Sequence, residues 1–103
     1  MKLEREYIAG LLEGRGYIYE LDNGAPRVQI RLHDRRILNM LKNEFGGTCY
    51  ESYEDSGKFD WRIQGLNVYD FLSELLPHLK IEKNRVKKML KNRWEPKKRA
   101  QSD

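Results

Sequence analysis

Basic and amide side chains alternate with apolar ones along two short segments of this sequence, residues 27–33 and 58–64. Alternate residues of an extended strand point to opposite faces, so each segment would gather its polar side chains on one face. Arginine and glutamine can make paired hydrogen bonds to guanine and adenine in the major groove of DNA, which also admits a two-stranded β-ribbon. The polar residues of this face would be Arg27, Gln29, Arg31, His33, Lys58, Asp60, Arg62 and Gln64, joined by Thr48, Tyr50 and Ser52 from a third segment.

The charge of the chain is divided unevenly along its length. The formal net charge is +4, but residues 1–79 contain 10 Lys/Arg against 13 Asp/Glu, whereas residues 80–103 contain 10 against 3. A basic segment suits an acidic partner such as nucleic acid, although a solvated helix and tail can have the same composition. Together with the polar strand face, this segment favours nucleic-acid binding. We expect Lys87, Lys88 and Lys91 to contact the nucleic-acid backbone.

The composition excludes several other kinds of site. Cys49 is the single cysteine, which excludes an internal disulfide and a cysteine-cluster zinc site. His33 and His78 are 45 positions apart and have no metal-ligand spacing, so we expect no bound metal and no other cofactor. No apolar run approaches the roughly 20 residues of a membrane helix. We expect a cytoplasmic protein without a membrane partner, associated with the nucleoid if its source is a bacterium or a phage.

Hydrophobic periodicity predicts the elements that position the polar residues. Apolar residues at helical spacing predict helices over 3–13, 35–45, 68–76 and 81–93, with Asp34 and Asn67 as N-caps and Ile81 on an inner face. Period-two alternation predicts strands over 16–22, 27–33, 48–53 and 58–64 in two β-hairpins, with Tyr17 and Tyr19 on the polar face.

These elements predict an α+β fold of the order α-β-β-α-β-β-α, followed by an extra basic C-terminal helix. The two hairpins would form one four-stranded antiparallel sheet with the helices on one face. Residues 1–95 would make a single DNA-binding domain, and residues 96–103 a basic, disordered tail.

Residues 7–16, with the sequence YIAGLLEGRG, resemble the motif that names the LAGLIDADG homing endonucleases. The similarity extends over about residues 3–93, because the next helix ends in FGG at 45–47, the second hairpin contains Trp61, and the following helix ends in LLPHL at 75–79. The resemblance implies that motif helices of two copies pack about a two-fold axis, so a chain with one motif would be a homodimer on double-stranded DNA. Tyr7, Gly10, Leu11 and Gly14 would lie in that interface, where glycines four positions apart let backbones approach closely.

Arg15 stands where the resemblance implies a metal-binding acid. In that family, one acid from each copy binds divalent metal beside the scissile phosphates. Mg²⁺ takes carboxylate and water oxygens, whereas a guanidinium is always cationic and attracts phosphate instead. We therefore expect Arg15 to contact DNA, cleavage to be lost, and the chain to act as a sequence-specific DNA-binding homodimer such as a transcriptional regulator.

Two other functions stay open at this point. An active endonuclease would need Mg²⁺ and a different acid, either Glu13, which lies about 200° around the helix from Arg15, or Asp60 on the polar face. An RNA-binding protein of the maturase type is the second alternative, since some members of the family assist intron splicing. Only a binding experiment separates DNA from RNA.

Overall fold

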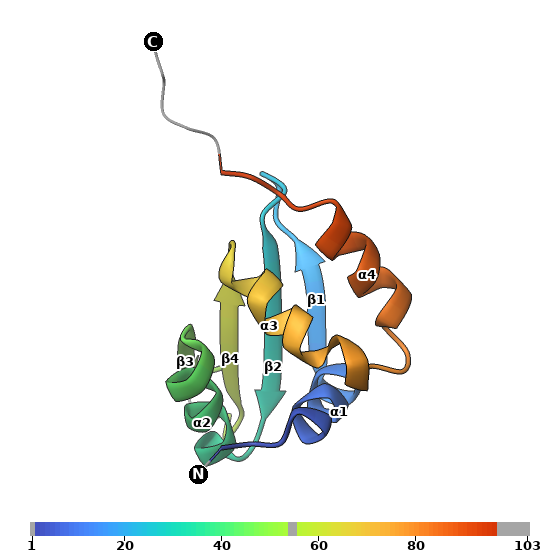
Figure 1. Cartoon of the computed structure of the whole chain (residues 1–103). Coiled ribbons are helices and arrows are strands. Elements are labelled where there is room, and N and C mark those ends of the chain that lie inside the picture. The colour runs from blue at the N-terminus through green and yellow to red at the C-terminus, as the bar shows by residue number, and fades with distance from the viewer. Residues whose placement is uncertain (1, 54–55, 97–103) are drawn as a thin grey trace.

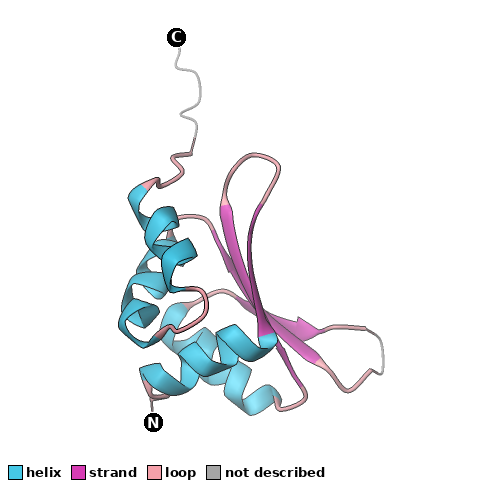
Figure 2. Cartoon of the chain, turned by 90° about the vertical axis from the view of Figure 1, so that its right-hand side faces the viewer, coloured by secondary structure: helices cyan, strands magenta, loops and turns pink. Residues whose placement is uncertain are grey.

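The computed structural model describes residues 2–53 and 56–96, which form one antiparallel sheet covered on one side by helices. The elements in chain order are α1 (Arg5–Arg15), β1 (Gly16–Glu20), β2 (Pro26–Leu32), α2 (Arg35–Phe45), β3 (Thr48–Glu51), β4 (Phe59–Gln64), α3 (Asn67–Leu75), the short 3-10 helix η1 (Leu76–His78) and α4 (Lys83–Lys91). This order and the layered arrangement confirm the predicted α+β fold (Figures 1 and 2).

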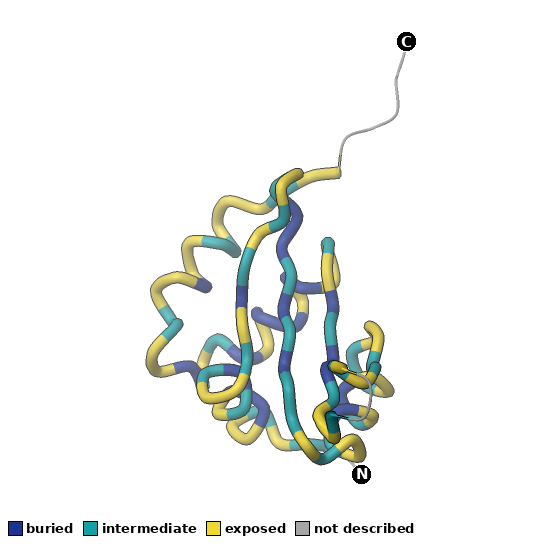
Figure 3. Tube along the Cα trace, turned by 180° about the vertical axis from the view of Figure 1, so that it is seen from behind, coloured by how far each residue is buried: buried dark blue, intermediate teal, exposed yellow. Residues whose placement is uncertain are grey.

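The sheet has the strand order β1-β2-β4-β3, so the two hairpins meet through their second strands. Val28 of β2 lies opposite Ile18 of β1 and Ile63 of β4, and all three side chains are buried. The neighbouring row contains Gln29, opposite Tyr17 and Arg62. Buried and half-buried residues alternate along β2 (Figure 3), which places apolar side chains toward the helices and polar ones on the uncovered face.

An aromatic cluster joins the central strands to the helices. The ring centroids of Phe45 and Phe71 are 4.9 Å apart, and those of Trp61 and Phe71 are 5.2 Å apart. The Trp61 indole N–H donates to the carbonyl of Gly46 at 2.8 Å. Gly47 has φ 92°, and a β-carbon there would come within 2.4 Å of the Arg62 carbonyl oxygen. The FGG sequence therefore fits a chain that passes directly against β4.

Several predicted element boundaries are wrong by two or more residues. The first helix begins at Arg5 and continues through Arg15, since the N–H of Gly16 still bonds the carbonyl of Leu12. The predicted strand 16–22 stops at Glu20, because a turn follows in which the N–H of Leu21 bonds the carbonyl of Ala25 at 2.8 Å. The strand predicted over 48–53 stops at Glu51, and residues 54–55 of the predicted turn lie outside the described residues.

One predicted N-cap is confirmed and the other is wrong. The Asp34 carboxylate accepts a hydrogen bond from the backbone N–H of Arg36 at 2.9 Å, as an N-cap does. Asn67 is the first residue of α3 itself, and no side-chain cap precedes it. A turn at Gly65, with φ 83°, starts this helix instead, and the Gly65 carbonyl accepts from the N–H of Val68 at 3.1 Å.

The last helix is shorter than predicted. It begins at Lys83, and Ile81 is 77% exposed rather than buried, because contacts from α1 hold the backbone before the helix in a different conformation. After α4, the Trp94 indole N–H donates to the carbonyl of Asn23 at 3.0 Å, which joins this segment to the β1–β2 turn. Residues 97–103 of the predicted tail lie outside the described residues. No helix in the described part of the chain is long and apolar enough to cross a membrane.

Candidate nucleic-acid interface

The helices leave one face of the sheet uncovered (Figure 2), and the strand register gathers on that face the polar side chains that the alternation predicted. Residues that lie opposite one another on adjacent strands become neighbours on this face, although they are far apart in sequence. The face contains Tyr17, Tyr19, Arg27, Gln29, Arg31, Tyr50, Asp60, Arg62 and Gln64, with His33 and Lys58 just beyond the ends of β2 and β4.

Arg27 is the centre of a hydrogen-bonded network on this face. Its Nε and Nη2 donate to the Gln64 side-chain oxygen at 3.0 and 2.6 Å, and its Nη1 donates to the Tyr19 hydroxyl at 3.1 Å. That hydroxyl donates in turn to the Gln29 side-chain oxygen at 3.2 Å. Since the Gln64 oxygen accepts two bonds, its amide N–H₂ is the group left to face a ligand. Arg27 thus positions its neighbours, and the two glutamines present hydrogen-bond donors.

Aromatic rings hold further arginines against the sheet. The guanidinium of Arg62 lies 5.5 Å from the ring centroid of Tyr50, and that of Arg31 lies 5.5 Å from the ring of Tyr53. Stacking of this kind orders a long side chain before any ligand arrives. Strict alternation over 48–53 predicts Tyr53 on the opposite face. This prediction is wrong because β3 ends at Glu51, so the alternation does not continue to Tyr53.

Asp60 is neutralised by Arg31. Asp60 is only 2% exposed, and its carboxylate accepts from Arg31 Nε at 2.8 Å and Nη2 at 3.2 Å. Hydrogen bonding to this carboxylate raises the pKa of Arg31 above its ordinary value. The Asp60 carboxylate is therefore engaged by Arg31 in a contact within the fold. Within residues 2–53 and 56–96, no three His, Cys, Asp or Glu side chains gather closely enough to hold a metal ion.

Glu13 also has structural partners. One carboxylate oxygen accepts from the backbone N–H groups of Lys80, Ile81 and Glu82, at 2.9, 2.6 and 2.8 Å. Burial alone would raise the pKa of Glu13, but these three bonds favour the ionised form and together lower the pKa below its ordinary value. The carboxylate thus joins the end of α1 to the segment that begins α4.

A basic hollow lies where α1 meets the sheet. It has a volume of about 310 Å³ and is lined by Gly14, Arg15, Gly16, Tyr17, Arg31, Leu32, His33 and Lys58. The backbone carbonyl of Gly57 lies 3.2 Å from His33 Nδ1, which fixes the imidazole at the rim. Five residues predicted to bind DNA therefore meet here, although they come from separate parts of the chain.

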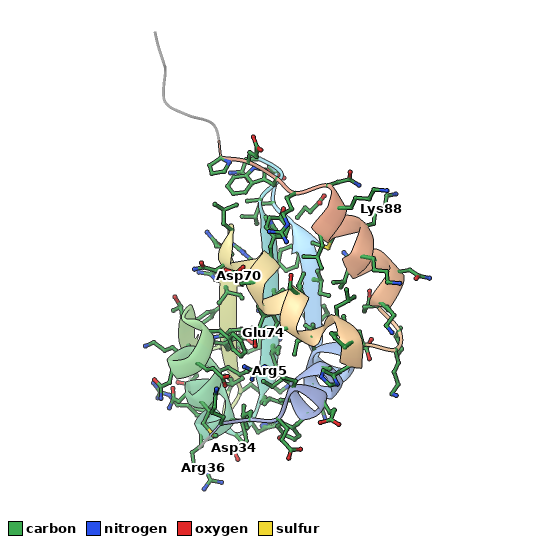
Figure 4. The ribbon with its side chains drawn as sticks, viewed as in Figure 1. Arg5, Asp34, Arg36, Asp70, Glu74 and Lys88 are labelled. Carbon is green, nitrogen blue, oxygen red and sulfur yellow. The ribbon has the colours of Figure 1, made fainter. Side chains whose placement is uncertain are left out.

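The lysines of α4 are not part of this surface. Lys87, Lys88 and Lys91 are exposed on a helix of the covered side, and Lys88 points away from the sheet (Figure 4). Val86 of α4 is buried in the core, and Arg85 donates to the carbonyl of Ile18 on the edge strand β1. Contact of these lysines with nucleic acid stays a prediction.

One face of α1 is open. Ile8, Ala9 and Leu12 point into the core, whereas Tyr7 is 46% exposed. A β-carbon added at Gly10 or Gly14 would meet no atom within 4 Å, so the two glycines leave a flat strip of backbone beside Tyr7 and the half-buried Leu11. Arg5, near the other end of the helix, bonds to Glu74 of α3 at 2.7 Å and holds α1 in place (Figure 4).

Neither a protein-family model nor a curated protein matches the sequence, but solved structures match the fold. The homing endonuclease I-CvuI, in complex with its target, has a TM-score of 0.66 and 18% identity over 84% of this chain and 63% of its own. The archaeal intron-encoded homing endonuclease I-Vdi141I, complexed with DNA, has a TM-score of 0.66 and 17% identity over 85% of this chain and 64% of its own. The LAGLIDADG homing endonuclease I-SmaMI, bound to cleaved DNA, has a TM-score of 0.56 and 22% identity over 87% of this chain and 36% of its own.

Proposed function

We propose that this chain, which has the fold of the LAGLIDADG homing endonucleases, binds double-stranded DNA sequence-specifically as a homodimer and does not cut it. The observation that carries the proposal is the polar sheet face, where Arg27, Gln29, Arg62 and Gln64 are ordered by bonds and stacking before a ligand is present. I-CvuI and I-Vdi141I are solved with their DNA. This chain spans less than two thirds of the length of either protein.

The chemistry of the face supports reading of base edges. Arginine and amide N–H groups match the N7 and O6 acceptors of guanine and the O4 acceptor of thymine. Gln64 has its oxygen occupied by Arg27, so it favours these acceptors over adenine, which also requires an acceptor from the protein. We therefore expect selected sites to be rich in guanine or thymine where Gln64 reads.

The open strip of α1 supports the homodimer. Two copies of this helix could approach closely at Gly10 and Gly14, and each would bring its own sheet to one side of a two-fold axis. A pseudo-palindromic site follows from that symmetry. Sedimentation of Gly10→Leu should show loss of the dimer, whereas Asn39→Leu, on the exposed side of α2, should leave it intact. A Gly10→Leu chain that remains fully dimeric would contradict this interface.

The residues at the end of α1 and Asp60 of β4 do not fit the divalent metal of the nuclease fold. Arg15 is cationic, the Glu13 carboxylate is held by three N–H groups, and Asp60 is paired with Arg31. Mg²⁺ requires oxygen ligands and waters, and a nearby guanidinium opposes it. These three positions support binding without cleavage.

Selection of bound sequences from a random duplex library tests the proposal, followed by incubation of the selected duplexes with Mg²⁺ or Mn²⁺. We expect specific binding without cuts by the natural chain, and Lys42→Asp provides a charge-reversal control on α2. Cuts by Arg15→Asp would identify the position of a lost metal ligand. Metal-dependent cuts by the natural chain, or preference for the same sequences as RNA, would overturn the proposal. Site-specific binding without cleavage suits a transcriptional regulator. A reporter gene placed downstream of a selected site tests this role.

A further inference from the structure

We infer that the hollow at the end of α1 is a phosphate site that works without a metal ion, and that it receives a backbone phosphate of bound DNA; the DNA part rests on the proposed function. The eight lining residues come from the junction of α1 with β1, from the end of β2 and from the position just before β4. Its cationic or donor side chains come from Arg15, Tyr17 and Lys58.

The charges in the hollow favour an anion. Arg15 and Lys58 are exposed, and neither forms an ion pair with any residue in the ranges 2–53 and 56–96. Arg31, by contrast, is bonded to Asp60 and forms a wall of the hollow rather than an available charge. The C-terminus of α1 contributes about half of a negative charge. This is much less than the two positive charges of Arg15 and Lys58, so the balance among the described lining residues is positive.

The donors suit phosphate in particular. A guanidinium offers several N–H groups in a planar fork, and a lysine ammonium adds a point charge with three donors. The hydroxyl of Tyr17 supplies a further donor, because Tyr17 is 63% exposed and lines the hollow. The volume of about 310 Å³ exceeds many times the ~10–15 Å³ that a cavity needs on this measure to hold one water, so the hollow has room for a phosphate group with bridging waters.

The position of the hollow connects it with DNA on the sheet. Tyr17 and Arg31 belong both to its lining and to the polar face, so the hollow lies next to where a duplex on that face would be bound. Contacts to phosphate fix the register of a protein on DNA but do not read its sequence. The hollow would therefore set where the duplex lies, while the Arg27 network reads bases.

Salt titration of DNA binding tests the site directly. Affinity for a selected duplex is measured by fluorescence anisotropy over a range of KCl, with EDTA present. We expect Arg15→Ala and Lys58→Ala to weaken binding equally on all sequences and to reduce the slope of log K against log salt by about 0.9 for each lost phosphate contact. Lys42→Ala removes the same charge from the exposed surface of α2 and should leave the slope unchanged. Binding that disappears in EDTA would overturn the inference.

A second arm uses inorganic phosphate and the same full-length chain without DNA. Phosphate should shift the amide NMR signals of Gly14, Gly16 and Tyr17, and the Arg15→Ala/Lys58→Ala double variant should abolish these shifts. Absent shifts together with unchanged salt slopes would overturn the phosphate site while specific duplex binding still supported the proposed function. Shifts with inorganic phosphate but no sequence-specific duplex binding would support the site and overturn the proposed function.

Discussion

Replacing Glu13 with glutamine should destabilise the chain without weakening specific DNA binding. One Glu13 oxygen accepts three backbone N–H groups from the segment that begins α4. Glutamine keeps an oxygen but removes the negative charge that strengthens these bonds. The variant therefore isolates the structural role of this acid from the catalytic role that the sequence left open.

The expected loss follows from the hydrogen bonds. A bond to a charged group contributes about 1.5–3 kcal/mol and a neutral one about 1 kcal/mol. The bonds to Lys80 and Ile81 are exposed, so water replaces part of their contribution. We expect Glu13→Gln to lower the free energy of unfolding by about 1 kcal/mol and Glu13→Ala by about 2 kcal/mol, within the range of lost N-caps. In a domain of this size, each 1 kcal/mol lowers the melting temperature by about 4–8 °C.

The pH dependence of stability provides an independent readout. The pKa of Glu13 is lowered in the folded chain from its ordinary value near 4.5. Its contribution is therefore complete above that ordinary value and is lost as the pH falls through the lowered folded value. The stability difference between the natural chain and Glu13→Gln should be constant at neutral pH and should shrink below about pH 4.5.

Thermal and urea unfolding at several pH values measure both effects, with Glu20→Gln, an exposed acid at the end of β1, as the control. An unchanged melting temperature of Glu13→Gln, with the same pH profile as the natural chain, would refute the capping role. A variant of normal stability that lost a metal-dependent cleavage would instead identify Glu13 as a metal ligand.

Three further changes test other parts of the structure. Arg27→Ala should reduce discrimination between DNA sites by about 1–3 kcal/mol, because Gln64 loses its positioning partner. Fluorescence anisotropy with matched and mismatched duplexes measures this, and an equal loss of affinity on all sequences would indicate a phosphate contact instead. Asp60→Asn should lower the free energy of unfolding by about 2 kcal/mol, since Arg31 keeps a half-exposed charge without its carboxylate. The midpoint of urea unfolding measures this loss. An unchanged midpoint would show that water solvates Arg31 as well as the Asp60 carboxylate does. Trp94→Ala should release the segment after α4 and speed limited proteolysis there, while the free energy of unfolding falls by about 1 kcal/mol. An unaltered rate of proteolysis would contradict the contact with the β1–β2 turn.

The parts of the fold that depend on local pattern could be predicted from the sequence. Alternation in 27–33 and 58–64 placed Val28 and Trp61 in the core and Gln29 and Arg62 on the open face, as the register confirms. The Asp34 cap could also be predicted, because its hydrogen bond joins residues only two positions apart in the chain. Such features need no knowledge of the rest of the structure.

The parts that failed depend on contacts between distant residues. Ile81 is exposed because Glu13, 68 positions earlier, holds its N–H, and no local pattern reveals that bond. Asn67 is a good N-cap by type, but the turn at Gly65 starts the helix before its side chain can act. The sequence therefore indicated the elements more accurately than their ends.

The candidate site divides in the same way. Its residue types and shared face follow from alternation, but the bonding of Arg27 to Gln64, 37 positions away, requires the pairing of β2 with β4. That pairing gives Arg27 a positioning role toward Gln64, and its own contact with DNA stays a prediction. The basic hollow likewise requires the end of α1 to lie against the starts of β1 and β4, which only the folded chain reveals.

The contact of Arg85 with the carbonyl of Ile18 has a consequence for the behaviour of the protein at high concentration. An edge strand with open carbonyls can pair with a strand of another molecule and begin aggregation. On β1, α4 lies beside this edge and Arg85 occupies one of its acceptors (Figure 1). The opposite edge, β3, is only four residues long and ends in the exposed Glu51. Both borders of the sheet are thus poor templates for strand addition.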